Sequence, residues 1–405
     1  MNGRTTPEWF DPEDDRTARA AWSRLAEPGD VAVVRCLRLL RPGHALLALM
    51  ERSERLGTVL RDPRPVANWR ARLSQVDPGR DLATMRRFGG RLVVPGDDEW
   101  PTGMALLGDR EPVALWARGP VSLGVTTRRA VAIVGCRASS RYGEWTAAEL
   151  ASGCVERGIT VVSGAAYGID AAAHRGALAV HGPTVAVLAC GVDRPYPRGN
   201  EELIEQIAAR GTLVSELPPG SSPTRWRFIT RNRLIAALGL ATVVVEAAWR
   251  SGASITAREA ALIGRDVAAV PGPVTSSTSA GCHRLLREGA VCVTDAAEIA
   301  ELLSAVGEHP APAPSVPVAE HDGLDEVDLR VLDALPVNTA VGVERLTATA
   351  GLDQALLLGS LARLEIAGRA ARVGTRWRRV PFRRPDTLLD TPLRRSPRGR
   401  STDRR

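Results

Sequence analysis

The chain has 405 residues, of which 44% are hydrophobic, and a formal net charge of +7. This length predicts two or three domains that can bury a substantial core. No apolar run is long enough to span a membrane, and the polar, acidic N-terminus is unlike a signal peptide, so we expect a cytoplasmic protein without a membrane partner. The six cysteines are scattered without a C-x-x-C pair, which favours reduced thiols over disulfides or a metal site.

The positive charge is concentrated at the C-terminal end. The chain has no lysine, and from Arg369 onward thirteen arginines stand against three aspartates, a local balance of +10 that leaves residues 1–368 at −3. Nucleic-acid binding by the body of the chain would therefore depend on a local arginine cluster. The tail is suited to nonspecific contact with polyanions.

Residues 1–13 are predicted to be disordered, and residues 14–90 to form a small helical domain. Its apolar residues recur at helical spacing over 18–26, 31–40, 45–57, 66–73 and 81–88. No polar constellation accompanies them, so this domain is interpreted as a packing or docking module.

Residues 91–303 are predicted to form an α/β domain. Strands at 92–94 and 113–117 would extend one edge of its sheet. Short β-branched runs then alternate with helical segments, which is typical of a parallel sheet covered by helices on both faces. The runs are 131–134, 159–162, 184–188, 212–214, 242–245, 267–270 and 290–293. The expected helices are 142–157, 170–180, 200–209, 232–239, 254–264, 281–288 and 296–303.

The C-terminal part begins with a Pro/Ala-rich linker at 304–322. Residues 323–381 follow the order helix, helix, turn, helix, hairpin, which predicts a winged helix. The basic tail at 382–405 is poor in apolar residues, so we expect it to be disordered.

Gly135-Cys136-Arg137 follows the first parallel strand, and Arg141 comes four residues later. Backbone N–H groups and Arg137 could hold a phosphate there, and the alternative is a tight strand–helix turn with solvated arginines. The turn has no G-x-G-x-x-G fingerprint, and without lysine the chain has no P-loop of the usual kind. Hydride transfer and nucleoside triphosphate hydrolysis therefore lose support, and no cofactor is expected.

A second loop of small residues, Ser163 to Asp170, follows the next strand. Gly164 and Gly168 leave room for a ligand, and Tyr167 could stack on a base. Asp170 could instead cap the helix that follows. His174 is interpreted as a packed helical histidine.

The segment Arg225 to Arg233 reads RWRFITRNR and is expected to be a loop before a helix. Alternating cations and aromatic rings suit a single strand, with arginines on phosphates and rings on bases. The alternative is the start of an amphipathic helix with exposed arginines and buried rings. As the segment precedes a strand, we expect it at the same sheet edge as the two loops. The residues predicted here to bind DNA are Arg225, Arg227, Phe228, Arg231, Asn232 and Arg233.

Glu246, Ser251-Gly252-Ala253 and Pro271-Gly272-Pro273 follow further strands and could line the same crevice. The sequence shows no Ser/His/Asp order, no paired carboxylates and no metal-ligand spacing. We therefore expect neither a catalytic residue nor a metal ion, and the chain is interpreted as a binding protein.

These segments together resemble the DNA-processing protein family DprA, also called Smf. The resemblance is strongest over about 92–293, and its segments are VAIVGCR, VVSGAAYGID, AVLACGVDRPYP, SELPPG, FITRNRLIA, VVVEAAWRSGASITA and VAAVPG. It implies an extended Rossmann-like domain that binds single-stranded DNA, a homodimer, and loading of the recombinase RecA in natural transformation or recombination. The implied pocket residues are Gly135, Arg137, Ser163, Gly164, Arg225, Phe228, Arg231, Asn232 and Arg233.

Two positions depart from the family pattern. Cys136 stands where the family usually has Ser, which removes a hydroxyl donor, and His283 stands where it usually has Asn. Two other functions are kept as alternatives. One is a nucleotide-cleaving enzyme of the lysine-decarboxylase-like group, whose P-G-G-x-G-T-x-x-E pattern is not present at Pro271-Gly272-Pro273. The other is a duplex-DNA adaptor that acts through the winged helix.

Overall fold

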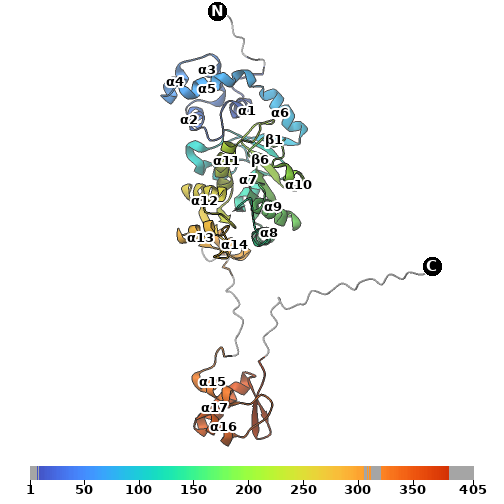
Figure 1. Cartoon of the computed structure of the whole chain (residues 1–405). Helices are drawn as coiled ribbons and strands as arrows, with labels where there is room; N and C mark the ends of the chain where they lie inside the picture. Colours follow the sequence, from blue (N-terminus) through green and yellow to red (C-terminus); the bar gives the residue numbers. More distant parts are fainter. Residues whose placement is uncertain (1–6, 8, 305–307, 309, 312–320, 383–405) are drawn as a thin grey trace, which may run out of the picture. The chain divides into compact units, whose positions relative to one another are not determined.

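A computed structural model describes residues 7, 9–304, 308, 310–311 and 321–382 (Figure 1). The chain divides into two compact units, residues 1–312 and 313–405. The predicted disorder of residues 1–6 and 383–405 lies outside the described residues, as does most of the predicted linker.

Helices α1 to α6 form the N-terminal part of the first unit. They are α1 (Asp15–Leu25), α2 (Val31–Leu39), α3 (Pro42–Met50), α4 (Arg55–Leu60), α5 (Arg64–Arg72) and α6 (Pro78–Arg87). Asp14 and Asp30 cap α1 and α2 by accepting from backbone N–H groups. Their core centres on Trp22 and Trp69, whose rings meet edge to face at 5.1 Å.

A nine-stranded sheet is the core of the first unit, in the order β1-β2-β6-β5-β4-β3-β7-β8-β9. The strands from β6 to β9 along this order are parallel, and β1 and β2 form an antiparallel extension. They are β1 (Gly90–Val93), β2 (Leu115–Arg118), β3 (Ala130–Val134), β4 (Thr160–Ser163), β5 (Thr184–Val187), β6 (Thr212–Ser215), β7 (Ala241–Val244), β8 (Asp266–Ala269) and β9 (Val291–Cys292). Every predicted strand is present, and β3 to β7 are buried along their whole length.

Helices cover both faces of this sheet (Figure 1). One face packs against α11 (Arg225–Leu238), α12 (Gly252–Leu262) and α13 (Ala280–Arg287). The other packs against α8 (Arg141–Glu156), α9 (Ile169–Ala179), α10 (Glu201–Arg210) and α14 (Ala296–Leu302). Short connections are α7 (Leu123–Thr126), η1 (Leu73–Gln75), η2 (Thr102–Arg110), η3 (Thr127–Arg129) and η4 (Arg198–Asn200).

The start of α11 corrects one sequence-based expectation. A helix was predicted from residue 232, whereas α11 begins at Arg225 and therefore includes the whole arginine cluster. Thr224 is the N-cap, and its side chain accepts from the backbone N–H of Arg227. The first turns of α11 lie at the carboxyl edge of the sheet, because Arg231 in its second turn donates to the carbonyls of Gly164 and Val187 at the ends of β4 and β5.

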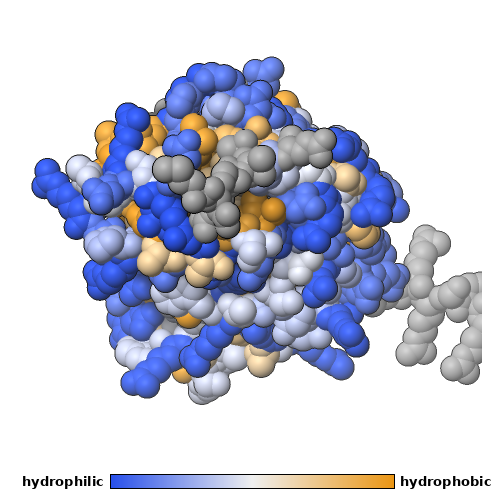
Figure 2. Space-filling model, turned by 90° about the horizontal axis from the view of Figure 1, so that it is seen from above, coloured by the Kyte–Doolittle hydropathy of each residue, from blue (hydrophilic) through white to orange (hydrophobic). Residues whose placement is uncertain are grey.

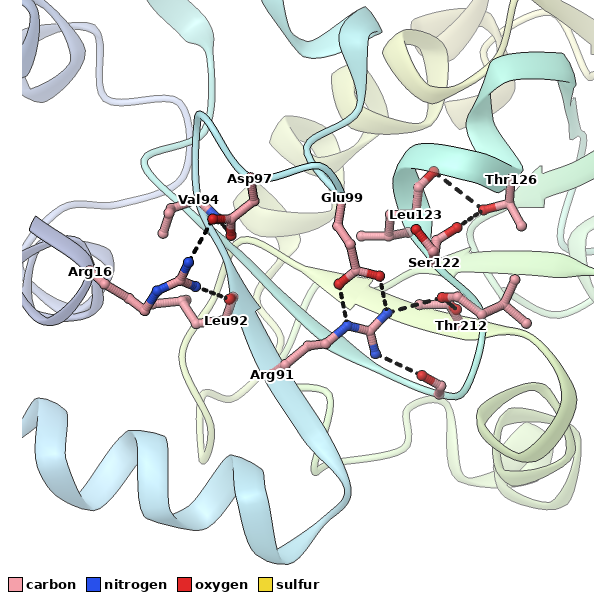
Figure 3. Close-up of polar contacts among 12 residues, drawn as sticks. Arg16, Arg91, Leu92, Val94, Asp97, Glu99, Ser122, Leu123, Thr126 and Thr212 are labelled. Atoms are coloured by element: carbon pink, nitrogen blue, oxygen red, sulfur yellow. Dashed lines mark hydrogen bonds and ion pairs between the residues drawn. The ribbon is translucent and has the colours of Figure 1, made fainter.

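Two arginines fix the β1–β2 extension to its surroundings (Figure 3). Arg16 of α1 donates to the carbonyl of Leu92 at 2.7 Å and to the carboxylate of Asp97 at 2.6 Å. Arg91 forms a two-point ion pair with Glu99 and donates to the carbonyl of Gly119 at 2.7 Å. The helical N-terminal part is thus joined directly to the sheet.

The second unit has its own core and its own sheet. It consists of α15 (Glu326–Ala334), α16 (Val343–Ala350), α17 (Gln354–Ile366) and the antiparallel hairpin β10 (Ala370–Val373) with β11 (Arg376–Arg379). Leu332, Leu361 and Trp377 belong to its core. This arrangement confirms the predicted winged helix, and the fold class expected from the sequence is confirmed as a whole.

Two further observations concern the surface. The view in Figure 2 shows a face that is mostly hydrophilic, with smaller hydrophobic areas between the hydrophilic ones. Among the described residues, no helix combines the length and the apolar character that a membrane crossing requires.

Candidate nucleic-acid interface

A pocket of about 910 Å³ in the first unit lies at the carboxyl edge of the parallel sheet. The sheet order runs from β4 through β3 to β7, so the direction of the strand order reverses at β3, where α/β proteins place ligands. The loop after β3, the first turns of α11, and the loop after β7 with the start of α12 form its walls. The predicted site residues that line it are Gly135, Cys136, Arg137, Arg225, Phe228, Arg231 and Asn232.

The ring of Phe228 is surrounded by two arginines and a tyrosine in this pocket. The guanidinium carbon of Arg137 lies 5.0 Å from the ring centroid, and that of Arg231 lies 5.9 Å from it. Tyr196 packs beside the same ring, with centroids 5.7 Å apart and planes tilted by 49°. The pocket therefore offers a cation and aromatic surface side by side.

Three arginines give the pocket its available positive charge. Arg137, Arg225 and Arg250 are exposed, and among the described residues none of them makes an ion pair. Asp170 also lines the pocket, but it is buried, and burial raises the pKa of its carboxyl. The accessible charge at this edge is accordingly positive.

Arg231 is held below the pocket rather than presented to solvent. It is 6% exposed, and its Nη1 donates to the carbonyl of Gly164 at 2.9 Å and to the carbonyl of Val187. Burial lowers the pKa of its guanidinium to about 10, and the charge of Asp170 opposes that shift. Arg231 therefore joins the ends of β4 and β5 to α11 as well as contributing positive potential.

The loop after β3 is fixed by Glu246, which is 2% exposed. Its carboxylate accepts from Ser140 N–H at 2.9 Å, from Ser140 Oγ at 2.6 Å and from Thr278 Oγ1 at 2.9 Å. The Cys136 thiol also faces this carboxylate, with 3.6 Å between Sγ and Oε2. Burial, and then the Glu246 charge, raise the pKa of that thiol to about 12. Cys136 is thus a neutral thiol that lies within reach of two acceptors of the protein itself, Glu246 Oε2 and the carbonyl of Ala138 at 3.4 Å.

Gly135 is required by the close approach of α9 to this loop. A Cβ at this position would lie 2.4 Å from the Ile169 side chain. Gly135 lines the pocket beside Arg137. The next backbone N–H, that of Cys136, donates to the carbonyl of Glu246 at 2.8 Å, so Arg137 rather than the loop backbone is the group available to an anion here.

The loop after β4 supports the site from behind. Ser163 is fully buried and donates to the carbonyl of Ile133 at 2.6 Å, and a Cβ on Gly164 would lie 2.5 Å from the Arg231 guanidinium. Gly168 has a φ of +76° and lies against the carbonyls of Cys136 and Arg137. Asp170 accepts from Gly164 N–H at 3.2 Å, so it binds this loop as well as lying in the first turn of α9.

Four other predicted residues lie outside the pocket lining. Tyr167 is 46% exposed, and its hydroxyl accepts from Gly199 N–H at 3.2 Å. Arg141 is the exposed first residue of α8. Arg227 forms a two-point ion pair with Glu27, at 3.0 Å for each bond, and Arg233 forms one with Glu216, at 2.9 and 2.7 Å. The arginine cluster is thus divided between the pocket and internal ion pairs.

Sequence reasoning did not select two pocket residues, Arg250 and Tyr196. Arg250 comes six residues after β7, at the edge where Ser251-Gly252 was already expected, so strand order alone would have indicated it. Tyr196 lies in a long connection after β5 that has no periodic signal. Only the folded chain brings Tyr196 to Phe228.

Comparison with known proteins finds relatives of this chain. A family model described as DNA recombination-mediator protein A matches residues 91–304. A Mycobacterium tuberculosis protein, provisionally described as a DNA processing protein DprA, is 47% identical over 378 residues, 90% of this chain and 95% of that protein. The DNA processing protein DprA of Streptococcus pneumoniae is 37% identical over 56% of this chain and 79% of its own length. An X-ray structure of DprA from S. pneumoniae covers 70% of this chain and 95% of that chain, with 32% identity and a TM-score of 0.59.

Proposed function

The chain belongs to the DNA recombination-mediator protein A family, also named DprA or Smf, and from that premise we propose that it binds single-stranded DNA in the pocket around Phe228 without reading base sequence. The observation that carries the proposal is the position of Arg137. Its guanidinium lies 5.0 Å from the Phe228 ring, in a pocket that Gly135 also lines. One phosphate on this cation and one base on this ring are the contacts that sequence-independent single-strand binding requires.

The aromatic floor favours a single strand over a duplex. Phe228 is only partly exposed and lies inside a pocket of about 910 Å³. A base stacked within a duplex cannot reach such a ring unless it is flipped out, which costs unstacking energy. A base of a single strand is already free to enter.

The arginines supply binding that depends on phosphates and not on sequence. Arg137, Arg225 and Arg250 surround the pocket and carry no ion pair among the described residues. Their contacts with phosphates would release counterions, so the affinity should fall steeply as salt rises. We include Gly135, Cys136, Arg137, Arg225, Phe228, Arg231 and Asn232 as the residues that form this site.

The proposal describes binding without catalysis. The two carboxylates next to the pocket, Glu246 and Asp170, are each engaged by donors of the protein itself. Neither is placed as a free base beside the open space. The proposal further includes transfer of the strand to RecA in recombination or natural transformation, a homodimeric protein and a cytoplasmic location, which rest on family membership.

The test is equilibrium binding of the full chain to a fluorescent single strand, its complement and their duplex. We expect the two strands to bind alike and to compete better than the duplex. Preference for the duplex would instead support an adaptor acting through the winged helix. Release of free base from nucleoside monophosphates, measured by chromatography in the same buffer, would support the nucleotide-cleaving alternative and contradict the proposal.

A further inference from the structure

A second pocket, of about 480 Å³, lies next to the first on the same unit. The two share Arg250, Ser251 and Ile255, which form the partition between them. The second pocket continues over α12 toward α13 and the edge of β8. The two pockets are therefore adjacent, with Arg250 common to both.

Trp249 gives the second pocket an exposed aromatic surface. The indole is 54% exposed, and the guanidinium carbon of Arg284 lies 5.2 Å from its ring centroid. Arg284 Nη1 also donates to the carbonyl of Trp249 at 3.2 Å. The Arg284 guanidinium thus lies against the Trp249 ring and is hydrogen-bonded to the Trp249 carbonyl. Much of the ring surface remains exposed.

The remaining lining has the chemistry of a nucleotide site. Arg250 and Arg258 are exposed at its rim, whereas Glu288 is the one acid in the lining and lies 3.6 Å from Arg284. The floor is apolar and contains Ala257, Val267 and Leu285. Two buried donors of the lining, Arg284 Nε and Ser254 Oγ, have no hydrogen-bond partner among the described residues, although Arg284 Nε lies 3.6 Å from Glu288 Oε1 in the ion pair. Excess donors and positive charge around an aromatic ring favour an acceptor-rich anionic ligand.

We propose that the second pocket is a further nucleotide subsite, in which a base stacks on Trp249 and its phosphate is bound by Arg250 and Arg258. The inference rests on the proposed function of the first pocket, and it adds a path for the strand. Both pockets place an arginine against an aromatic ring, at 5.0 Å for Phe228 and 5.2 Å for Trp249. Arg250 lies between them and could contact the connecting phosphate.

The test compares oligothymidylates of two lengths, about 4 and about 12 nucleotides, on the full chain. The variant Trp249→Ala should bind the short oligonucleotide as the wild type does, because the first pocket is unchanged. It should bind the long one between about 5-fold and about 100-fold more weakly, the range that the loss of one stacked base gives. Trp249→Phe, which keeps a ring, should recover most of the loss.

Trp145→Ala is the matched control. Trp145 is 65% exposed on α8 and lines neither pocket, so this variant should bind both lengths as the wild type does. Recovery by Trp249→Phe distinguishes a lost contact from a misfolded protein.

Two results would overturn the subsite. In the first, Arg137→Ala weakens binding of both oligonucleotides, while Trp249→Ala binds the long oligonucleotide as tightly as Trp145→Ala does. The first pocket would then be a DNA site and the second would not. In the second, Trp249→Ala changes the mass in analytical ultracentrifugation without changing the affinity for the long strand, which would make this pocket a protein contact. If the wild type binds neither length, the proposed function itself fails.

Discussion

Arginines that look alike in the sequence differ in role because their surroundings differ. Arg225 is exposed at the pocket, whereas Arg231 and Arg233 on the same helix are 6% and 2% exposed. The acids that neutralise Arg227 and Arg233 are Glu27, 200 residues away in the sequence, and Glu216, 17 residues away. The spacing of the charges could predict a basic cluster, but it could not predict which arginines the folded chain would engage in internal ion pairs.

His174 shows the same dependence on surroundings for a titrating group. It is fully buried, and its Nδ1 lies 2.7 Å from Thr184 Oγ1, which itself donates to the carbonyl of Val161. Nδ1 is therefore the donor, and Nε2 remains unprotonated without a partner among the described residues. Burial, aided by Arg231, lowers the pKa of His174 to about 3.

The lowered pKa predicts acid sensitivity. The unfolded chain binds a proton at His174 below about pH 6.5, while the folded chain does not bind it until about pH 3, so stability falls as the pH falls through this window. His174→Gln should remove this contribution, and its free energy of unfolding should change less between pH 6.5 and pH 4.5 than that of the wild type. Urea titrations at both pH values give these free energies of unfolding. If the free energy changes by the same amount between the two pH values in His174→Gln and in the wild type, the prediction is contradicted. Asp170 titrates in both proteins, so its contribution cancels.

At the scale of elements, strands were predictable and one helix start was not. Parallel strands buried on both faces need uninterrupted apolar residues, so β3 to β8 were located within one or two residues of their ends. The first two turns of α11 carry alternating arginines and aromatics without an apolar stripe, and this pattern was interpreted as a loop. Thr224 before Arg225 was the signal for its N-cap.

Arg231 joins three elements, so its removal should affect folding more than charge. Arg231→Ala leaves two buried carbonyls without their donor and removes the cation that faces Asp170. We expect a loss of about 3 kcal/mol in unfolding free energy. Arg225→Ala, an exposed arginine on the same helix, should unfold at the wild-type temperature. Equal melting temperatures for the two variants in calorimetry would contradict the supporting role of Arg231.

At the scale of the whole molecule, the topology of the parallel sheet explains why segments far apart in the sequence meet at one pocket. The carboxyl ends of parallel strands share one edge, which is why Gly135-Cys136-Arg137 and the start of α11 could be expected together from sequence. The pairing of Tyr196 with Phe228 depends on the long connection after β5, and the second pocket depends on how α13, itself predicted, packs beside Trp249. Neither contact has a local signal in the sequence.

The division into two units predicts that the pocket binds DNA alone. A chain ending at residue 312 keeps the first unit and loses the winged helix and the basic tail. It should retain single-strand affinity within about 10-fold, with a shallower salt dependence because the tail arginines are gone. A chain ending at residue 382 is the control that removes only the tail. Loss of all single-strand binding on truncation at 312 would mean that binding requires the second unit, which contradicts the prediction.

The central claim, that the strand binds at Arg137 and Phe228, is tested most directly by salt titration of single-strand binding to Arg137→Ala. We expect affinities for oligothymidylate and for a mixed sequence to fall alike, by about 10-fold or more, and the slope of log affinity against log salt to decrease by about 0.7 for the lost phosphate contact. Arg210→Ala, at an exposed position at the end of α10 outside both pockets, should match the wild type. An Arg137→Ala protein with wild-type affinity and salt slope would contradict the account.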